Sequence, residues 1–145
     1  MCYLVYLSTD CADDLSRQTS DLVRLERPPV DWRPPGPHVL THPHNWFVGS
    51  KSGCSCTFRH LHRDSVSLGF EGRQDWFPED DEAIEATRQL YEILRDLVDH
   101  GHRVELLDCW SEEEDRAAVP LDVSLSQVPP DAFRLFEGHL FKLRV

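Results

Sequence analysis

The 145-residue sequence lacks several features that mark common classes of protein. It has no apolar run approaching the ~20 residues of a membrane-spanning helix, and no basic segment precedes its first apolar stretch as in a signal peptide. It also has no glycine-rich phosphate-binding pattern and no G-x-S-x-G hydrolase motif. These absences predict a cytoplasmic protein that does not bind membranes, and they identify no reaction.

Basic residues are few. Fifteen Lys and Arg stand against 26 Asp and Glu, which gives a net charge of −11. An acidic field repels phosphate backbones, so we expect no nucleic-acid partner, and a protein or small-molecule partner stays open. The length and the 40% hydrophobic content are typical of one globular domain over residues 1–145.

The five cysteines are an odd number, and nothing in the sequence indicates secretion. An odd count in such a chain predicts reduced thiols rather than a disulfide framework. None of the cysteines forms the C-x-x-C pair that is common in structural zinc sites. Cysteine is also a small apolar residue that often only packs in a core, so inert core thiols are one interpretation of all five.

A long amphipathic helix is the clearest element, and we expect it at about 78–100. Its apolar positions recur with the period of a helix: Ala83, Thr87, Leu90, Tyr91, Leu94, Leu97 and Val98. Pro78 suits a first turn, and Gly101 is typical of the residue that ends a helix.

Strand patterns occupy much of the remaining chain. They are predicted at 2–8, 21–27, 45–50, 54–63, 104–110, 121–127 and 139–145, with 45–50 and 54–63 forming a hairpin. Half of the ten prolines lie in 28–37, which predicts an extended connection or a ligand for a proline-binding module. The predicted fold is therefore α+β, with a mainly antiparallel sheet of about five or six strands packed against the helix.

The densest group of reactive side chains follows Gly53. If 54–63 is a strand, alternation places Cys54, Cys56, His60 and His62 on one face. Two thiolates on one face can share a metal ion with ligands from neighbouring strands, for which Cys2 and Cys109 are the candidates. Four cysteines would form a closed zinc site.

A reactive thiol is the alternative use of the same segment. Positive charge lowers a thiol pKa, so Arg59 and His60 could activate Cys54 or Cys56 as the nucleophile of a thiol-dependent enzyme. The spacing from Cys54 to Arg59 is C-x4-R rather than the C-x5-R of a phosphatase cradle. The best hypothesis is a small binding or scaffold protein with a thiol-rich, zinc-binding site. The thiol-dependent enzyme and a plain protein-interaction domain with core cysteines are its alternatives.

Three short motifs add a resemblance. They are the cysteine-containing segment 2–10, the centre Gly53-Cys54-Ser55-Cys56-Thr57-Phe58-Arg59, and Cys109-Trp110 after the helix. Together they resemble a group of small bacterial proteins of unknown activity, which have a cysteine in the first strand, a G-C-x-C-x-F-R centre and a C-W pair after the long helix. The resemblance implies no reaction, but it groups Cys2, Cys54, Cys56 and Cys109 and leaves Cys11 out.

Overall fold

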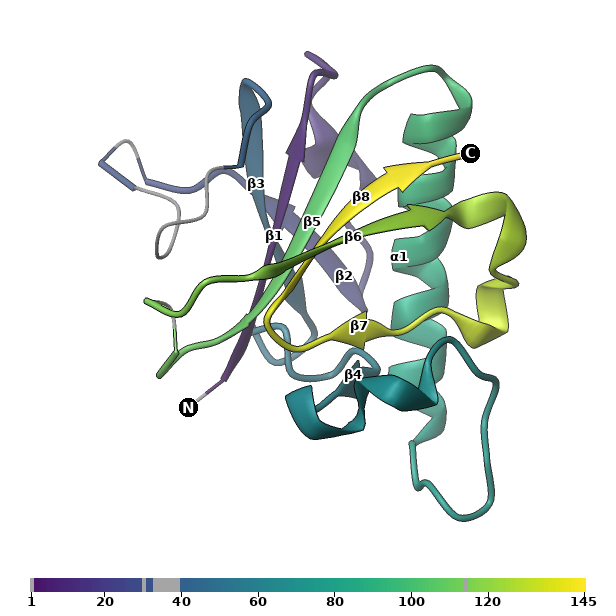
Figure 1. Ribbon diagram of the computed structural model, residues 1–145. Helices are drawn as coiled ribbons and strands as arrows, with labels where there is room; N and C mark the ends of the chain where they lie inside the picture. The colour runs from purple at the N-terminus through teal and green to yellow at the C-terminus, as the bar shows by residue number, and fades with distance from the viewer. Residues whose placement is uncertain (1, 30, 33–39, 114) are drawn as a thin grey trace.

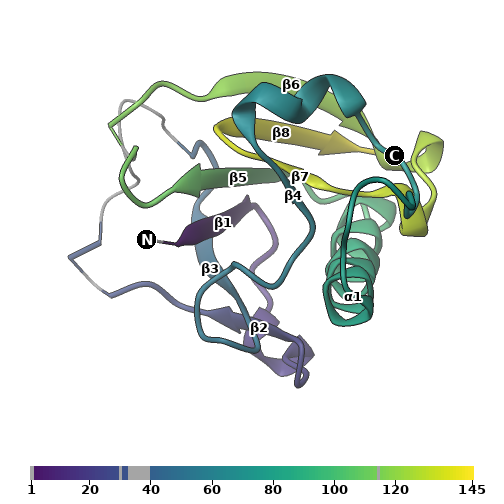
Figure 2. The ribbon, with the colours of Figure 1, turned by 90° about the horizontal axis from the view of Figure 1, so that it is seen from below.

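A six-stranded sheet curls around one long helix in this computed structural model, which describes residues 2–29, 31–32, 40–113 and 115–145 (Figures 1 and 2). The strands of this sheet are β1 (Tyr3–Thr9), β2 (Val23–Glu26), β3 (His44–Ser50), β5 (Val104–Trp110), β6 (Val119–Ser124) and β8 (His139–Arg144). Their order is β2-β3-β1-β5-β8-β6, and every neighbouring pair is antiparallel except β6 with β8. The predicted α+β class is confirmed.

The helix α1 (Asp81–Asp99) packs its apolar stripe into the concave face of the sheet (Figure 2). Asp80 caps it, because its Oδ1 accepts a hydrogen bond of 2.7 Å from the backbone N–H of Ala83. The chain leaves the helix through Gly101, whose φ of 83° is accessible mainly to glycine. The helix predicted over 78–100 is confirmed with a start three residues later, since Asp80 is the capping residue.

Strand β1 lies in the middle of the sheet and is covered on both faces, as its apolar sequence predicts. Val5 and Leu7 belong to the main core beneath α1 and are fully buried. Tyr6 points to the opposite face, where it packs in a smaller apolar cluster that includes Trp32 and Leu107. Burying a large aliphatic side chain contributes about 1.5–3 kcal/mol, so these two clusters hold the sheet from both sides.

The short elements lie outside the main sheet. A parallel two-stranded sheet joins β4 (His60–Leu61) to β7 (Leu135–Phe136). The described residues also form four short 3-10 helices: η1 (Leu15–Gln18), η2 (Arg63–Leu68), η3 (Leu125–Gln127) and η4 (Pro130–Ala132). Most of the proline-rich segment 28–37, residue 30 and residues 33–37, lies outside the described residues. In the part of the chain that is described, no helix is long and apolar enough to cross a membrane.

The strand predicted over 54–63 is wrong, and so is its hairpin with 45–50. Only β4 is extended there, and residues 54–58 form turns. The chain reverses within a few residues, because the backbone N–H of Ser50 donates to the carbonyl of Cys54 at 2.7 Å and Gly53 adopts a φ of 90°. Alternation along a strand therefore does not bring Cys54 and Cys56 together.

Candidate metal centre

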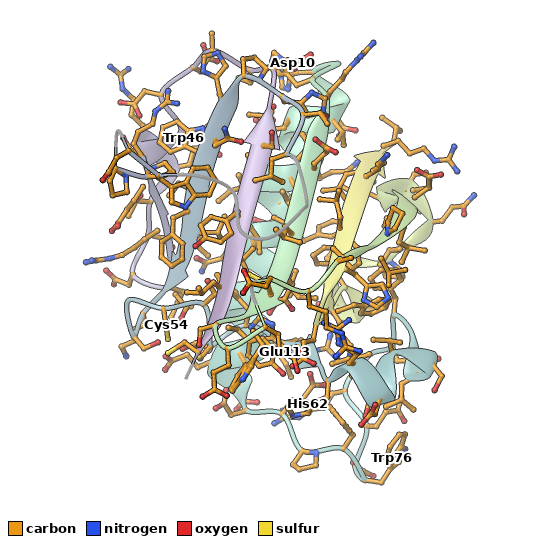
Figure 3. All side chains as sticks on the ribbon, turned by 60° about the vertical axis from the view of Figure 1, so that its left-hand side comes forward. Asp10, Trp46, Cys54, His62, Trp76 and Glu113 are labelled. Carbon is orange, nitrogen blue, oxygen red and sulfur yellow. The ribbon has the colours of Figure 1, made fainter. Side chains whose placement is uncertain are left out.

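Three cysteine sulfurs converge where β1 begins. The Sγ atoms of Cys2, Cys54 and Cys56 all lie within 4.8 Å of one another, and this trio is called the thiol cluster below. Cys2 immediately precedes β1, while Cys54 and Cys56 come from the turn after β3. Cys56 is exposed and the other two are half-buried. Figure 3 shows Cys54 at the end of the sheet opposite to Asp10. Three thiols in this arrangement form a group that can hold a metal ion.

Ser55 explains how the turn reaches β1. Beyond the pairing of Val5 with Val48, β3 no longer accompanies β1, and Ser55 takes its place. The Ser55 backbone N–H donates to the carbonyl of Tyr3 at 3.1 Å, and its hydroxyl accepts from the N–H of Val5 at 2.9 Å. The same hydroxyl donates to the carbonyl of Val48 at 2.6 Å. A fully buried serine thus substitutes for a strand partner and places the cysteines on either side of it beside β1.

Cys2 is fixed by the other neighbour of β1. Its backbone N–H donates to the hydroxyl of Ser111 at 3.0 Å, and its carbonyl accepts from the N–H of Ser111 at 2.9 Å. One residue on, the N–H of Tyr3 donates to the sulfur of Cys56 at 3.3 Å. The start of β1 is therefore held by backbone contacts from both sides, so the thiol cluster is built on ordered backbone.

The thiols of the turn titrate very differently. Burial alone would raise the pKa of Cys54, but hydrogen bonds from the Ser52 hydroxyl and from the backbone and thiol of Cys56 and the thiol of Cys2 lower it to about 7. The Ser52 oxygen lies 3.3 Å from the Cys54 sulfur. Burial and the neighbouring Cys54 raise the pKa of Cys56 to about 12. One thiolate, centred on Cys54, is thus present near neutral pH and is stabilised by the two remaining thiols.

His60 is an anchor beneath the turn. Its Nε2 donates to the carbonyl of Ser55 at 2.6 Å, its Nδ1 lies 2.8 Å from Asp108 Oδ2, and the Tyr3 ring stacks on it at 3.9 Å. Because the carbonyl only accepts, Nε2 carries a proton. The pair is then either an imidazolium with a carboxylate or a neutral imidazole that accepts from a protonated Asp108. Complete burial raises the pKa of Asp108. In both states the two ring nitrogens are engaged, so His60 is not available as a base for a cysteine.

Arg59 is engaged just as completely. Two of its five N–H donors, on Nε and Nη2, bond the Glu79 carboxylate at 2.8 Å. The other three bond the backbone carbonyls of Glu71, Asp131 and Phe133. Arg134 donates to the same Glu79 carboxylate at 3.2 Å, and both guanidinium groups are buried. Arg59 therefore joins the start of α1 to the segment before β7 rather than facing the thiol cluster.

The remaining expected residues lie in different places. Cys109 is buried on the outer face of β5, where it packs with Tyr6 and Leu107 and its sulfur lies 3.5 Å from the carbonyl of Leu4. The structure does not bring it into the thiol cluster. His62 is exposed, its Nδ1 lies 3.0 Å from the Tyr3 hydroxyl, and it lines a cleft of about 320 Å³ together with Cys56.

Sequence reasoning missed Ser55 and Asp108, on which this local structure depends. Asp108 carried a signal, since it is an acid within the apolar run of β5, and such a residue needs a buried partner. Ser55 carried none, because its role depends on the chain reversal at Gly53. Comparison with protein-family models, curated proteins and solved structures finds no match to this chain. The resemblance of its three motifs to small bacterial proteins therefore stays a prediction.

Proposed function

We propose that this protein binds a thiophilic metal ion at the thiol cluster, with zinc as the first candidate. The observation that carries the proposal is the mutual approach of the three sulfurs within 4.8 Å. Sulfurs bound at 2.3 Å to a tetrahedral zinc lie about 3.8 Å apart, so a small closure of the turn is enough. Thiolates select soft and borderline ions such as zinc and monovalent copper over magnesium or calcium.

The protonation of the cluster favours the same conclusion. Metal ligation needs thiolates, and the low pKa of Cys54 supplies the first one near neutral pH. A bound dication then favours deprotonation of Cys56 and Cys2, whose protons are released on binding. The affinity should therefore rise with pH.

Three sulfurs leave one position of a tetrahedral ion open. Structural zinc sites are closed by four protein ligands, whereas an open position accepts water, a small ligand or a further side chain. Cys56 and the exposed His62 both line the cleft of about 320 Å³ beside the thiol cluster. We infer a metal-binding protein whose ion stays accessible from this cleft, rather than a fold that depends on the metal.

Elemental analysis of protein purified without chelator tests the proposal, with an expected content near one ion per chain. Cobalt(II) substitution should then give the intense near-ultraviolet absorption of thiolate ligation. Replacing Cys2, Cys54 or Cys56 with Ser should each weaken binding by about tenfold or more. Cys109→Ala and Cys11→Ala are matched controls that remove a thiol outside the cluster. Metal below about 0.1 ion per chain after incubation with zinc, or equal loss in the Cys109 control, would contradict the proposal.

A second candidate function rests on the pKa of Cys54, which is about 7. Such a thiol is a nucleophile at neutral pH, as a thiol-dependent enzyme needs. The version that uses His60 and Arg59 as activating groups has little support, because both side chains are fully engaged elsewhere. A reactive Cys54 would be activated instead by Ser52 and by the other two thiols of the cluster.

A further inference from the structure

A second candidate site lies at the opposite end of the sheet. The start of β5, the end of β8 and the turn after α1 enclose a cleft of about 480 Å³. Its lining includes Arg103, Lys142 and Arg144, and these three residues define the cationic cleft. Asp10 bonds the backbone of Arg103, so its label in Figure 3 marks this end of the sheet, far from Cys54.

The strand register brings the charges of this cleft together. Val104 pairs with Leu143 and Glu105 with Lys142, and the same antiparallel register continued by one residue places Arg103 opposite Arg144. Side chains directly opposite in neighbouring strands lie about 4.5–5.5 Å apart at Cβ and share a face. The two guanidinium groups therefore belong to the same end of the sheet. Like charges in this arrangement destabilise a sheet.

The cations of this cleft lie near carboxylates. Lys142 stands opposite Glu105 on β5 and beside Asp122 on β6. Within the described residues, the side chains of Arg103, Lys142 and Arg144 make no ion pair, although the protein has a large acidic excess. All three are exposed. Most exposed basic side chains in such a protein can form an ion pair with a nearby carboxylate, so three adjacent ones that form none remain available to an anionic ligand.

Two of the carboxylates near the cleft, those of Glu105 and Asp10, are already committed to other donors. Buried Glu105 accepts from the backbone N–H and the hydroxyl of Thr41 at 2.8 and 2.7 Å, and His42 Nε2 lies 3.6 Å away. Asp10 accepts from the backbone N–H of Arg103 at 3.0 Å, and His102 Nδ1 lies 3.3 Å from it. These acids position the backbone around the cleft and leave the guanidinium and ammonium groups to face solvent.

We propose that the cationic cleft binds a small phosphorylated molecule. Guanidinium groups present planar forks that match phosphate oxygens with paired, charge-assisted hydrogen bonds, and a lysine adds a compact charge. The cleft volume lies within the range of small-molecule sites. Val145, which is 56% exposed, adds an apolar surface to the lining for the organic part of the ligand. A bound phosphate also relieves the repulsion between the facing arginines.

Isothermal titration at low ionic strength with glucose 6-phosphate, inorganic phosphate and citrate tests this proposal. We expect the phosphate compounds to bind more tightly than citrate. The double variant Lys142→Gln/Arg144→Gln should lose about tenfold or more in affinity, since each charge-assisted bond contributes on the order of a tenfold factor. The variant Arg17→Gln/Arg24→Gln removes two exposed arginines elsewhere and changes the net charge equally, so its affinity should match the parent protein.

Thermal unfolding separates a binding role from a structural one. Without ligand, the double variant Lys142→Gln/Arg144→Gln should melt close to the parent protein, because both side chains are exposed and make no ion pair within the described residues. Inorganic phosphate should raise the melting temperature of the parent protein more than chloride does at equal ionic strength, and this difference should disappear in the double variant. Equal effects of phosphate and chloride on the parent, equal binding of citrate, or equal loss in the Arg17/Arg24 control would each overturn the proposal.

Discussion

The segment from Cys54 to His60 has two parts that behave in opposite ways. Its first part, with Cys54 and Cys56, carries accessible thiols whose protons are shared. Its second part, with Arg59 and His60, carries polar groups that are buried and fully hydrogen-bonded. Residues that are adjacent in sequence thus need not share a site. The basic residues beside these cysteines hold the turn in place, and the thiols depend for their properties on Ser52 and on each other.

Removing the charge of Glu79 should cause the largest loss in the free energy of unfolding, because Glu79 is the ion-pair partner of Arg59. Burial alone would raise the pKa of Glu79, but hydrogen bonds from Arg59 and the charges of Arg59 and Arg134 lower it below its usual value. Glu79→Gln leaves two buried guanidinium groups without a counter-charge. We expect a loss of about 3–5 kcal/mol in the free energy of unfolding, measured by urea denaturation.

The exposed Glu85 on the same helix supplies the control for Glu79. Glu85→Gln removes an equal charge and should change the free energy of unfolding by less than about 0.5 kcal/mol. A similar small effect of Glu79→Gln would mean that the buried arginines do not anchor the segment. The sign of the pH dependence is also defined. The pKa of Glu79 is lower in the folded state than in the unfolded state. Its contribution to the free energy of unfolding is therefore complete at a pH above the unfolded-state pKa, and it is lost as the pH falls through the folded-state pKa.

Ser55→Ala should have the next largest effect, because Ser55 joins the two parts of the segment to β1. The change leaves the buried N–H of Val5 and carbonyl of Val48 without this partner. Each unsatisfied group costs about 1–3 kcal/mol, so we expect a loss of about 2–4 kcal/mol by denaturation. Metal affinity should fall together with stability. A variant that keeps full metal affinity would show that the turn does not need this anchor.

The reactivity of the thiols in the first part of the segment can be tested by measuring their alkylation rates over a range of pH. The thiolate of Cys54 is half formed near its pKa of about 7, so its alkylation rate should rise through that pH and level off about one unit above it. Cys56 is more exposed but has a pKa of about 12, so it should react far more slowly at pH 8. Mass spectrometry of the labelled peptides measures both rates. Faster labelling of Cys56 would mean that exposure, and not the shared proton, controls reactivity.

The contrast between the two parts of the segment also explains which features of the structure the sequence could predict. The apolar positions before Gly101 and in β1 correspond to the buried positions of these elements. For this reason α1 and the central strand could be predicted from the sequence. The geometry of the thiol cluster was not, because it depends on a turn in which Ser55 replaces a strand. The cationic cleft could not be predicted from the sequence, since Arg103 and Arg144 come to the same end of the sheet only through the register of β5 and β8.

The smallest effect on stability is expected from a change at Ser52, which tests how the turn lowers the pKa of Cys54. Ser52 is exposed, and its hydroxyl contacts the Cys54 sulfur and the hydroxyl of Ser50. Ser52→Ala should therefore change the free energy of unfolding by less than about 0.5 kcal/mol. It should nevertheless raise the pKa of Cys54, because the hydrogen bond from Ser52 is a leading cause of its lowering. The alkylation profile should shift to higher pH, while Ser126→Ala, another exposed serine, should leave it unchanged. If the profile does not shift, the low pKa of Cys54 is caused by the neighbouring thiols alone and Ser52 does not contribute to it.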